Sequence, residues 1–131
     1  MNVFDEVIAG VLERDPRYHR DSYLFAQEVF DHALEMRTAA EKRSERSRAS
    51  RHLTGAELCE ALRDMAFSRF GMLARAVLAD WGIQATRDFG NIVFNLIEAG
   101  AMRKHEDDRV EDFDDCFEFE RAFQVEVELL P

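Results

Sequence analysis

The chain has 131 residues and a formal net charge of −10, with 47% hydrophobic and 34% charged residues. This length suits one domain with one core, and the charge content is typical of a folded chain rather than a disordered one. No apolar run approaches the roughly 20 residues that cross a bilayer, and the N-terminus lacks the basic and apolar regions of a secretory signal. We therefore expect a cytoplasmic protein without a membrane partner.

Two helices are predicted in residues 1–37, as an N-terminal helical pair. Apolar residues recur at helical spacing over residues 3–13. This helix ends at Asp15-Pro16, because proline disfavours the helical conformation of the residue before it. A second apolar stripe predicts a helix over residues 21–37.

Residues 38–50 have almost nothing to bury, and residues 37–51 carry six basic and two acidic side chains. We interpret 38–50 as a flexible basic linker or loop, with a frayed continuation of the preceding helix as the alternative. The basic side chains also leave open a contact with a nucleic acid.

Residues 51–100 predict three more helices. Thr54 with Glu57 forms a capping-box pattern, and Gly71 ends this helix. A helix over 72–81 offers four residues to the core: Leu73, Val77, Leu78 and Trp81. The last helix is capped by Thr86, ends at Gly100 and carries an unbroken apolar stripe of Phe89, Ile92, Val93, Leu96 and Ile97.

After Gly100 the periodicity changes. Residues 101–104 and 109–119 predict two strands joined by an acidic turn, and residues 116–120 and 125–129 alternate between apolar and polar. The predicted fold class is mainly α (α+β): residues 51–131 form a winged-helix-like three-helix unit with a C-terminal β-hairpin or small antiparallel sheet. The whole chain, 1–131, is predicted to be a single domain.

Three motifs carry a resemblance to known proteins. They are Asp15-Pro16-Arg17-Tyr18, the block that begins Thr54-Gly55-Ala56-Glu57-Leu58, and Asp88-Phe89-Gly90-Asn91 with the apolar residues up to Ile97. Together they resemble an uncharacterised family of small bacterial conserved hypothetical proteins, over nearly the whole chain except residues 38–50. The resemblance implies a single-domain architecture and brings no assigned reaction, cofactor or partner.

Nothing in the sequence predicts catalysis or a cofactor. There is no nucleophile motif, phosphate-binding loop or dinucleotide fingerprint. The four histidines, His19, His32, His52 and His105, do not share metal-ligand spacing, and Cys59 and Cys116 do not form a CxxC pair. We predict a protein that is not an enzyme and has neither metal nor cofactor. The cysteines are interpreted as buried thiols, with a disulfide as the alternative.

The leading functional prediction is a protein-interaction or regulatory module, because nine acidic residues between Glu106 and Glu120 would repel a phosphate backbone. The candidate docking residues are Phe113, Phe117, Phe119, Asp112, Asp114 and Asp115. The partner is predicted to be another protein or a second copy of this chain, which residues 125–130 would meet as a strand edge. The alternative is a nucleic-acid-binding winged helix that uses Arg87, Asn91, Asn95, Arg103 and Lys104.

Overall fold

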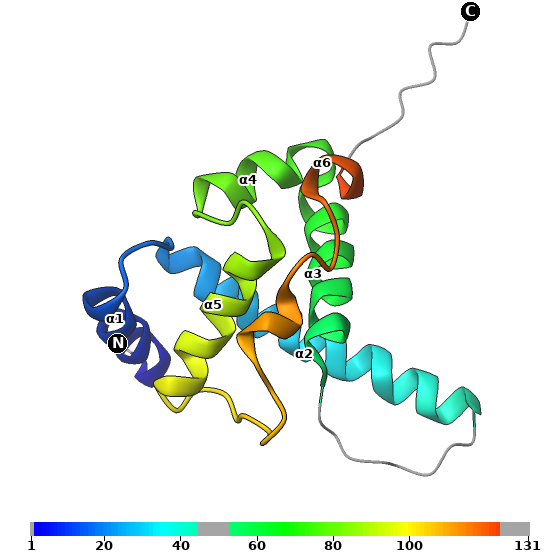
Figure 1. The fold of residues 1–131 in the computed structure, drawn as a ribbon, viewed down its shortest axis with the longest axis horizontal. Helices are drawn as coiled ribbons and strands as arrows, with labels where there is room; N and C mark the ends of the chain where they lie inside the picture. Colours follow the sequence, from blue (N-terminus) through cyan, green and yellow to red (C-terminus); the bar gives the residue numbers. More distant parts are fainter. Residues whose placement is uncertain (1, 45–52, 124–131) are drawn as a thin grey trace, which may run out of the picture.

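The computed structural model describes residues 2–44 and 53–123, and within these ranges every regular element is helical (Figure 1). The elements are α1 (Val3–Arg14), α2 (Arg20–Ser44), α3 (Gly55–Phe70), the 3₁₀ turn η1 (Gly71–Leu73), α4 (Ala74–Asp80), α5 (Thr86–Glu98), the 3₁₀ turn η2 (Val110–Phe113) and α6 (Phe119–Ala122). Helix α2 therefore continues through residues 38–44, while residues 45–50 of the predicted linker lie outside the described residues.

The predicted winged helix is wrong, because none of the residues described between Gly100 and Phe123 forms a strand. The alternating pattern at residues 116–120 instead leads into α6, where Phe119 and Phe123 lie one helical turn apart and both are buried. The second alternating run, residues 125–129, lies outside the described residues. Within residues 53–123 no strand lies beside the first run to share the hydrogen bonds of a sheet.

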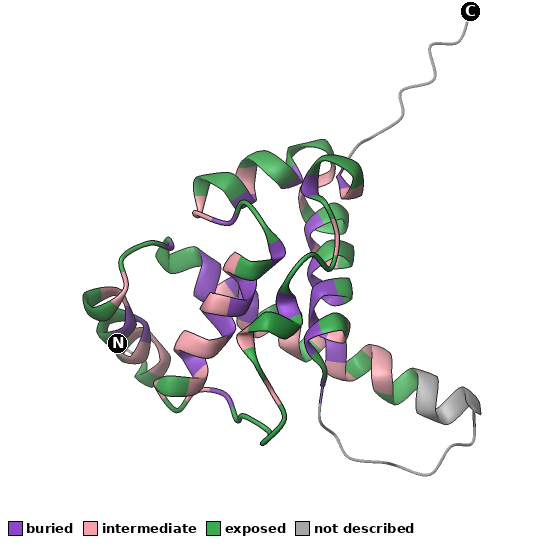
Figure 2. Cartoon of the chain, in the orientation of Figure 1, coloured by how far each residue is buried: buried purple, intermediate pink, exposed green. Residues whose placement is uncertain are grey.

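Helix α2 is the central element, and it packs against α1, α3 and α5. Helix α5 in turn packs against η2, and the short helices α4 and α6 lie near the C-terminal end of α3 (Figure 1). Buried residues line the inward faces of α2, α3 and α5 (Figure 2). The fully buried large side chains include Tyr23, Phe89, Ile8, Leu62, Leu78, Ile92 and Leu96.

Helix α3 begins and ends where its local signals predict. The Thr54 side chain accepts the Glu57 backbone N–H at 3.1 Å, and the Glu57 carboxylate accepts the Thr54 N–H at 3.2 Å. Gly71 ends the helix with a φ of 53°, a conformation that glycine adopts without a steric penalty. Both predictions are confirmed.

The predicted helix 72–81 is divided, and one of its predicted core residues is exposed. The 3₁₀ turn η1 occupies residues 71–73, and α4 begins only at Ala74. The tighter turn changes which side chains face inward. Ala74 and Leu78 are fully buried, whereas Leu73 is 65% exposed.

Four of the five residues in the apolar stripe of α5 are buried as predicted and Ile97 is partly buried, but the helix cap differs. Thr86 is the first residue of the helix rather than its cap, and its hydroxyl donates to the Phe113 carbonyl at 2.5 Å. The backbone N–H groups of Gln84 and Ala85 are accepted by the Asp88 carboxylate. Thr86 therefore ties α5 to η2, and Asp88 satisfies the helix start.

No helix among the described residues is long and apolar enough to span a bilayer.

Candidate functional site: an apolar groove with a basic rim

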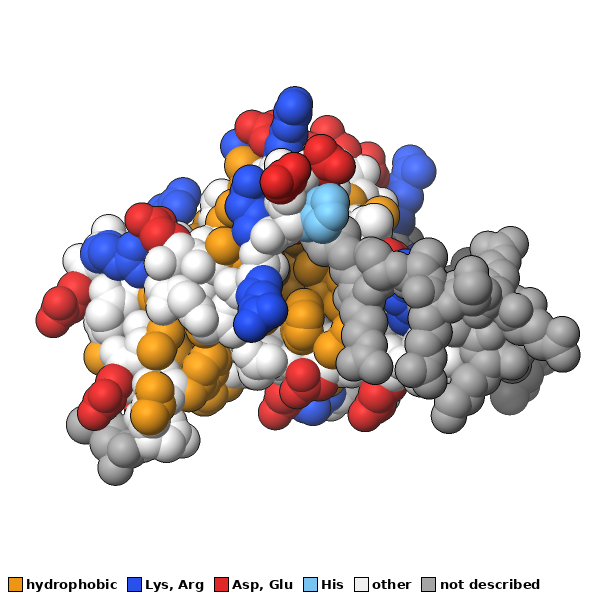
Figure 3. Space-filling model, turned by 90° about the horizontal axis from the view of Figure 1, so that it is seen from below, with side chains coloured by type: hydrophobic (Ala, Val, Ile, Leu, Met, Phe, Trp, Pro, Cys, Tyr) orange, Lys and Arg blue, Asp and Glu red, His pale blue; other side chains and the backbone are white. Residues whose placement is uncertain are grey.

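A groove of about 570 Å³ opens between α2, the start of α3, α5, the loop after α5 and η2. Hydrophobic side chains are visible at its floor in Figure 3, with basic side chains at its edge. The large apolar residues that line it are Phe30, Leu34, Leu53, Leu58, Val93, Phe94, Ile97, Met102 and Phe113. We call this surface the groove. Its volume is in the range of sites that hold small molecules or a few side chains of a partner.

Two helices expose apolar surface to the groove from opposite sides. Phe30 and Leu34 lie one turn apart on α2, and Phe94 and Ile97 lie about one turn apart on α5. All four side chains are partly buried against the core and remain partly accessible. The groove therefore offers apolar surface that a ligand can still cover.

One wall of the groove is held rigidly, because two glycines allow η2 to approach closely. A Cβ on Gly55 would lie 2.9 Å from the Cβ of Asp112, and a Cβ on Gly90 would lie 2.7 Å from the Cβ of Phe113. Both distances are shorter than Cβ contacts in folded proteins allow. Glycine at these two positions lets η2 pack directly against α3 and α5.

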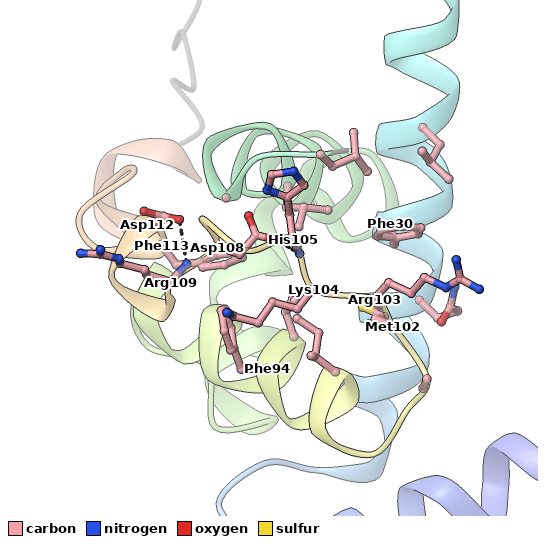
Figure 4. Close-up of a pocket in the computed structure, with 18 of the residues that line it drawn as sticks. Phe30, Phe94, Met102, Arg103, Lys104, His105, Asp108, Arg109, Asp112 and Phe113 are labelled. Carbon is pink, nitrogen blue, oxygen red and sulfur yellow. Dashed lines mark hydrogen bonds between the residues drawn. The ribbon is translucent and has the colours of Figure 1, made fainter. Parts of the chain in front are cut away.

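Three cations at the mouth of the groove, Arg103, Lys104 and Arg109, form what we call the basic rim (Figure 4). All three are exposed, and none forms an ion pair with a described residue. Among the arginines whose side chains the structure describes, every other one except Arg63 does form an ion pair: Arg14, Arg17, Arg20, Arg37, Arg69, Arg75, Arg87 and Arg121. Among the described side chains of this chain, whose net charge is −10, the cations without an ion pair are these three at the groove and Arg63.

The acidic side chains beside the basic rim have structural partners. The Asp108 carboxylate accepts the His105 backbone N–H at 2.9 Å, and the Asp112 carboxylate accepts the Arg109 backbone N–H at 3.0 Å. The second of these bonds is the dashed line in Figure 4. Both carboxylates close local turns of the loop between α5 and η2, which fixes where the rim residues emerge.

The predicted docking residues do not form one surface. Phe113 and Phe119 are buried at 3% and 6% exposure, and Phe117 is partly buried. Phe117, Phe119 and Phe123 pack together, with ring centroids 5.4 to 5.9 Å apart. These aromatic rings complete the core. Only Phe113 and Asp112 of the predicted set line the groove.

The remaining two aspartates of that set lie outside the groove. Asp114 accepts two hydrogen bonds from Arg87 at 2.9 and 3.0 Å. Asp115 is exposed and has a positive φ of 50°. Asp112, Asp114 and Asp115 therefore have different surroundings and do not form one acidic patch.

The residues of the nucleic-acid alternative separate into two groups. Arg87 is paired with Asp114, Asn91 donates to the Tyr18 hydroxyl at 3.0 Å, and Asn95 donates to the Asp15 carboxylate at 3.0 Å. These side chains are used inside the domain. Arg103 and Lys104 belong to the basic rim and remain available.

The α5 amides belong to a polar cluster that fastens the α1–α2 connection to α5. The Tyr18 hydroxyl donates to Asp88 at 2.8 Å, and burial is the main reason that the pKa of Tyr18 rises to about 12. Arg17 binds the Asp15 carboxylate through two side-chain hydrogen bonds, which hold the pKa of that carboxyl well below its usual range. Since each member has a partner, we assign this cluster a structural role.

In comparisons with known proteins, no family model, curated protein or solved structure matches this chain. The family resemblance inferred from its motifs therefore stays a prediction. Among the described residues, no group of three or more His, Cys, Asp or Glu side chains is arranged to hold a metal ion.

Proposed function

We propose that the protein is a non-enzymatic interaction module whose groove binds an apolar segment of a partner protein that carries acidic side chains. The observation that supports this most directly is the concentration of unpaired cations, Arg103, Lys104 and Arg109, around an apolar groove. Of the Phe-rich acidic segment that the sequence suggested as the docking surface, only Asp112 and Phe113 line this groove.

Apolar contact supplies the affinity in this proposal. Each Leu-sized or Phe-sized side chain that a partner buries is worth about 1.5–3 kcal/mol in transfer free energy. Phe30, Leu34, Phe94 and Ile97 already contact the core on one side, so a ligand meets surfaces that are largely ordered before it binds. Pre-ordered surfaces lower the entropy that binding costs.

The charges of the basic rim determine which partner segments bind. Most of the protein surface repels an acidic segment, because the chain carries 27 acidic and 17 basic side chains. At the basic rim this repulsion is locally reversed, which orients an acidic segment toward the groove and disfavours a basic one. The same contacts are exposed, so we expect binding to weaken as ionic strength rises.

The nucleic-acid alternative has less support from the geometry. Three of its five residues, Arg87, Asn91 and Asn95, would have to give up hydrogen bonds within the domain before contacting bases. The other two residues, Arg103 and Lys104, lie beside an apolar floor. This surface suits a segment with apolar side chains better than a uniform phosphate backbone.

The proposal is tested by selecting displayed random dodecapeptides on the immobilised protein and sequencing those that are enriched. We expect enriched peptides to combine two or more large apolar residues with Asp or Glu. The best peptide is then labelled, and its affinity is measured by fluorescence anisotropy with wild-type protein and with the double variant R103E/K104E. Reversal of both rim charges should weaken binding about tenfold, which corresponds to 1.4 kcal/mol.

Arg63 provides a control for the reversal of one exposed charge outside the groove. It is exposed on α3, forms no ion pair with a described residue and does not line the groove, so R63E should bind the peptide as the wild type does. The pair F30A and F67A tests the apolar contribution, because Phe30 lines the groove whereas Phe67 is 45% exposed outside it. Enriched peptides without acidic residues, or equal affinities for R103E/K104E and R63E, would contradict the proposal.

A further inference from the structure

A segment with the chemistry that the groove is proposed to bind occurs in this chain itself. Residues 124–131 lie outside the described residues, and their sequence is Gln-Val-Glu-Val-Glu-Leu-Leu-Pro. In an extended segment, successive side chains point to opposite faces. The two valines and Leu129 would then share one face, and the two glutamates would share the other. The segment therefore combines an apolar face with an acidic one.

The groove has the same two properties in a complementary arrangement. Its floor is apolar, and the three cations of the basic rim lie at its mouth (Figure 3, Figure 4). When the apolar face of the segment enters the groove, Glu126 and Glu128 stay at the mouth, beside Arg103 and Lys104. Opposite charges at the edge of an apolar contact fix the orientation of a partner and disfavour segments of the wrong charge.

The distance along α3 favours the segment of a second copy over that of the same copy. Ala122 and Phe67 line the same small hollow near the end of α3, whereas the groove reaches Gly55 at the start of this helix. At about 1.5 Å per residue, Phe67 and Gly55 are about 18 Å apart along α3. An extended chain covers about 3.3 Å per residue, so most of residues 124–129 would be needed to cross this distance. In a second copy the whole segment is available to enter the groove.

We propose that the groove of one copy binds residues 125–130 of a second copy, so that the chain associates with itself. This inference rests on the proposed function, because it names the segment that occupies the same groove. Two chains with a net charge of −10 repel each other. Association therefore requires a local match of charge, which the basic rim and the two glutamates supply.

Cys116 provides a labelling site outside the groove. The interpretation of both cysteines as buried thiols is wrong for this residue, because Cys116 is exposed, whereas Cys59 is 1% exposed. A maleimide fluorophore therefore reacts at Cys116, which does not line the groove. The anisotropy of the labelled full chain is measured while unlabelled full chain is added, and self-association of the wild type should raise it.

Two charge-reversed variants test which surfaces meet. R103E/K104E reverses the rim and keeps the segment, and E126K/E128K keeps the rim and reverses the segment. Each variant alone should self-associate about tenfold more weakly than the wild type, because like charges then face each other. An equimolar mixture should recover the wild-type affinity, because the segment of each variant meets a rim of opposite charge on the other.

The double variant E6K/E13K is the matched control for net charge. Glu6 and Glu13 are exposed on α1, which does not line the groove. Because each Glu→Lys change adds two positive charges, E6K/E13K and E126K/E128K both have a net charge of −6 instead of −10. General repulsion between copies is reduced equally in the two, yet only E126K/E128K should lose affinity.

A wild type that stays monomeric up to its solubility limit, equal self-association of the wild type and E126K/E128K, or no recovery in the mixture would overturn the inference. Binding of the selected peptide, measured in parallel, separates this inference from the proposed function. Rim-dependent peptide binding by a monomeric wild type would overturn the second copy alone, whereas equal peptide binding by the wild type and R103E/K104E would overturn both. Tighter peptide binding by E126K/E128K than by a monomeric wild type would place the segment in the groove of its own copy, which also overturns the inference.

Discussion

At the scale of single residues, two helical glycines have opposite surroundings. Gly90 lies under Phe113, where a Cβ would approach the ring at 2.7 Å, and nothing lies within 4 Å of a Cβ on Gly10. In Gly90→Ala the overpacking costs about 1–3 kcal/mol and outweighs a helix-propensity gain of up to about 1 kcal/mol. Gly10→Ala gains the propensity alone. Urea unfolding should show a lower midpoint for the first variant and a higher one for the second; a stabilised Gly90→Ala would contradict the close packing of η2.

Asp15 contributes to the free energy of unfolding, and its contribution depends on pH. Its folded-state pKa is lowered, mainly by the Arg17 side chain, so its charged form stabilises the fold fully above its ordinary pKa of about 4. The contribution is lost as the pH falls below that value. Asp15→Asn should therefore cost about 1 kcal/mol near pH 7, and the difference from the wild type should shrink by pH 3.

Unfolding free energies of the two proteins, measured by urea titration at both pH values, check this prediction. The difference between them isolates Asp15 from the other carboxylates that titrate over the same range. An equal difference at pH 7 and pH 3 would show that the charge of Asp15 is not what holds the α1–α2 connection to α5.

At the scale of elements, the stabilising effect of the Thr54 cap of α3 can be compared with that of Thr38, a threonine inside α2. The Thr54 hydroxyl satisfies a backbone N–H that has no partner within the helix, whereas the Thr38 hydroxyl donates to the Leu34 carbonyl within α2. Thr54→Ala should destabilise the protein by about 1 kcal/mol. Thr38→Ala should be neutral or slightly stabilising, because alanine favours the helix interior. Equal losses in thermal denaturation would argue against the cap.

Elements with strong local signals were predictable from the sequence. The box at Thr54 and Glu57, the stop at Gly71 and the stripe of α5 each depend on residues within a few positions of one another. The segment after Gly100 was not predictable in the same way. Its buried residues, Met102 and Phe113 among them, face the core through contacts with distant helices rather than through a regular period.

The acidic residues of that segment were misinterpreted for a related reason. Asp108 and Asp112 accept backbone N–H groups three residues before them, a role that suits turns and excludes the extended backbone of a strand. In the sequence alone they read as the solvent-facing positions of a hairpin. Whether these carboxylates close turns or face solvent on a hairpin depends on the backbone geometry of the segment, which in turn depends on where η2 packs.

At the scale of the whole molecule, the groove exists only because segments from α2 to η2 come together. Phe30 belongs to the apolar stripe of residues 21–37 and Phe94 lies outside the stripe of α5, and nothing local shows that both stay partly accessible. Arg103 and Lys104 were identified as candidate contacts, but for a nucleic acid. Their lack of ion-pair partners becomes visible only when the pairing of the other arginines is known.

The salt dependence of binding separates the two contributions to the proposed interaction. With the selected peptide, the wild-type protein should bind more weakly as sodium chloride increases, since the rim charges are exposed and screened. R103E/K104E should show a flatter or reversed dependence, while F30A should be weaker at every salt concentration with the wild-type slope. Anisotropy titrations at several ionic strengths provide the check, and a wild-type affinity independent of salt would exclude a contribution from the rim.

A second exposed apolar surface is the principal rival to the groove. Phe67, Met72 and Leu73 are 45%, 68% and 65% exposed near the junction of α3 and α4. Near this surface Arg69 and Arg75 are both paired, and one arginine without an ion pair, Arg63, lies beside Phe67, compared with three such cations at the groove. A purely apolar ligand could bind either surface, whereas an acidic one should favour the groove with its three cations.

Titration of ¹⁵N-labelled protein with the selected peptide, followed by backbone amide shifts, tests the central claim most directly. If the groove is the docking surface, the largest changes will fall on the amides around Phe30, Phe94 and residues 100–109, and they will be greatly reduced in R103E/K104E. Changes centred instead on Phe67, Met72 and Leu73, and unaffected by that variant, would contradict the account.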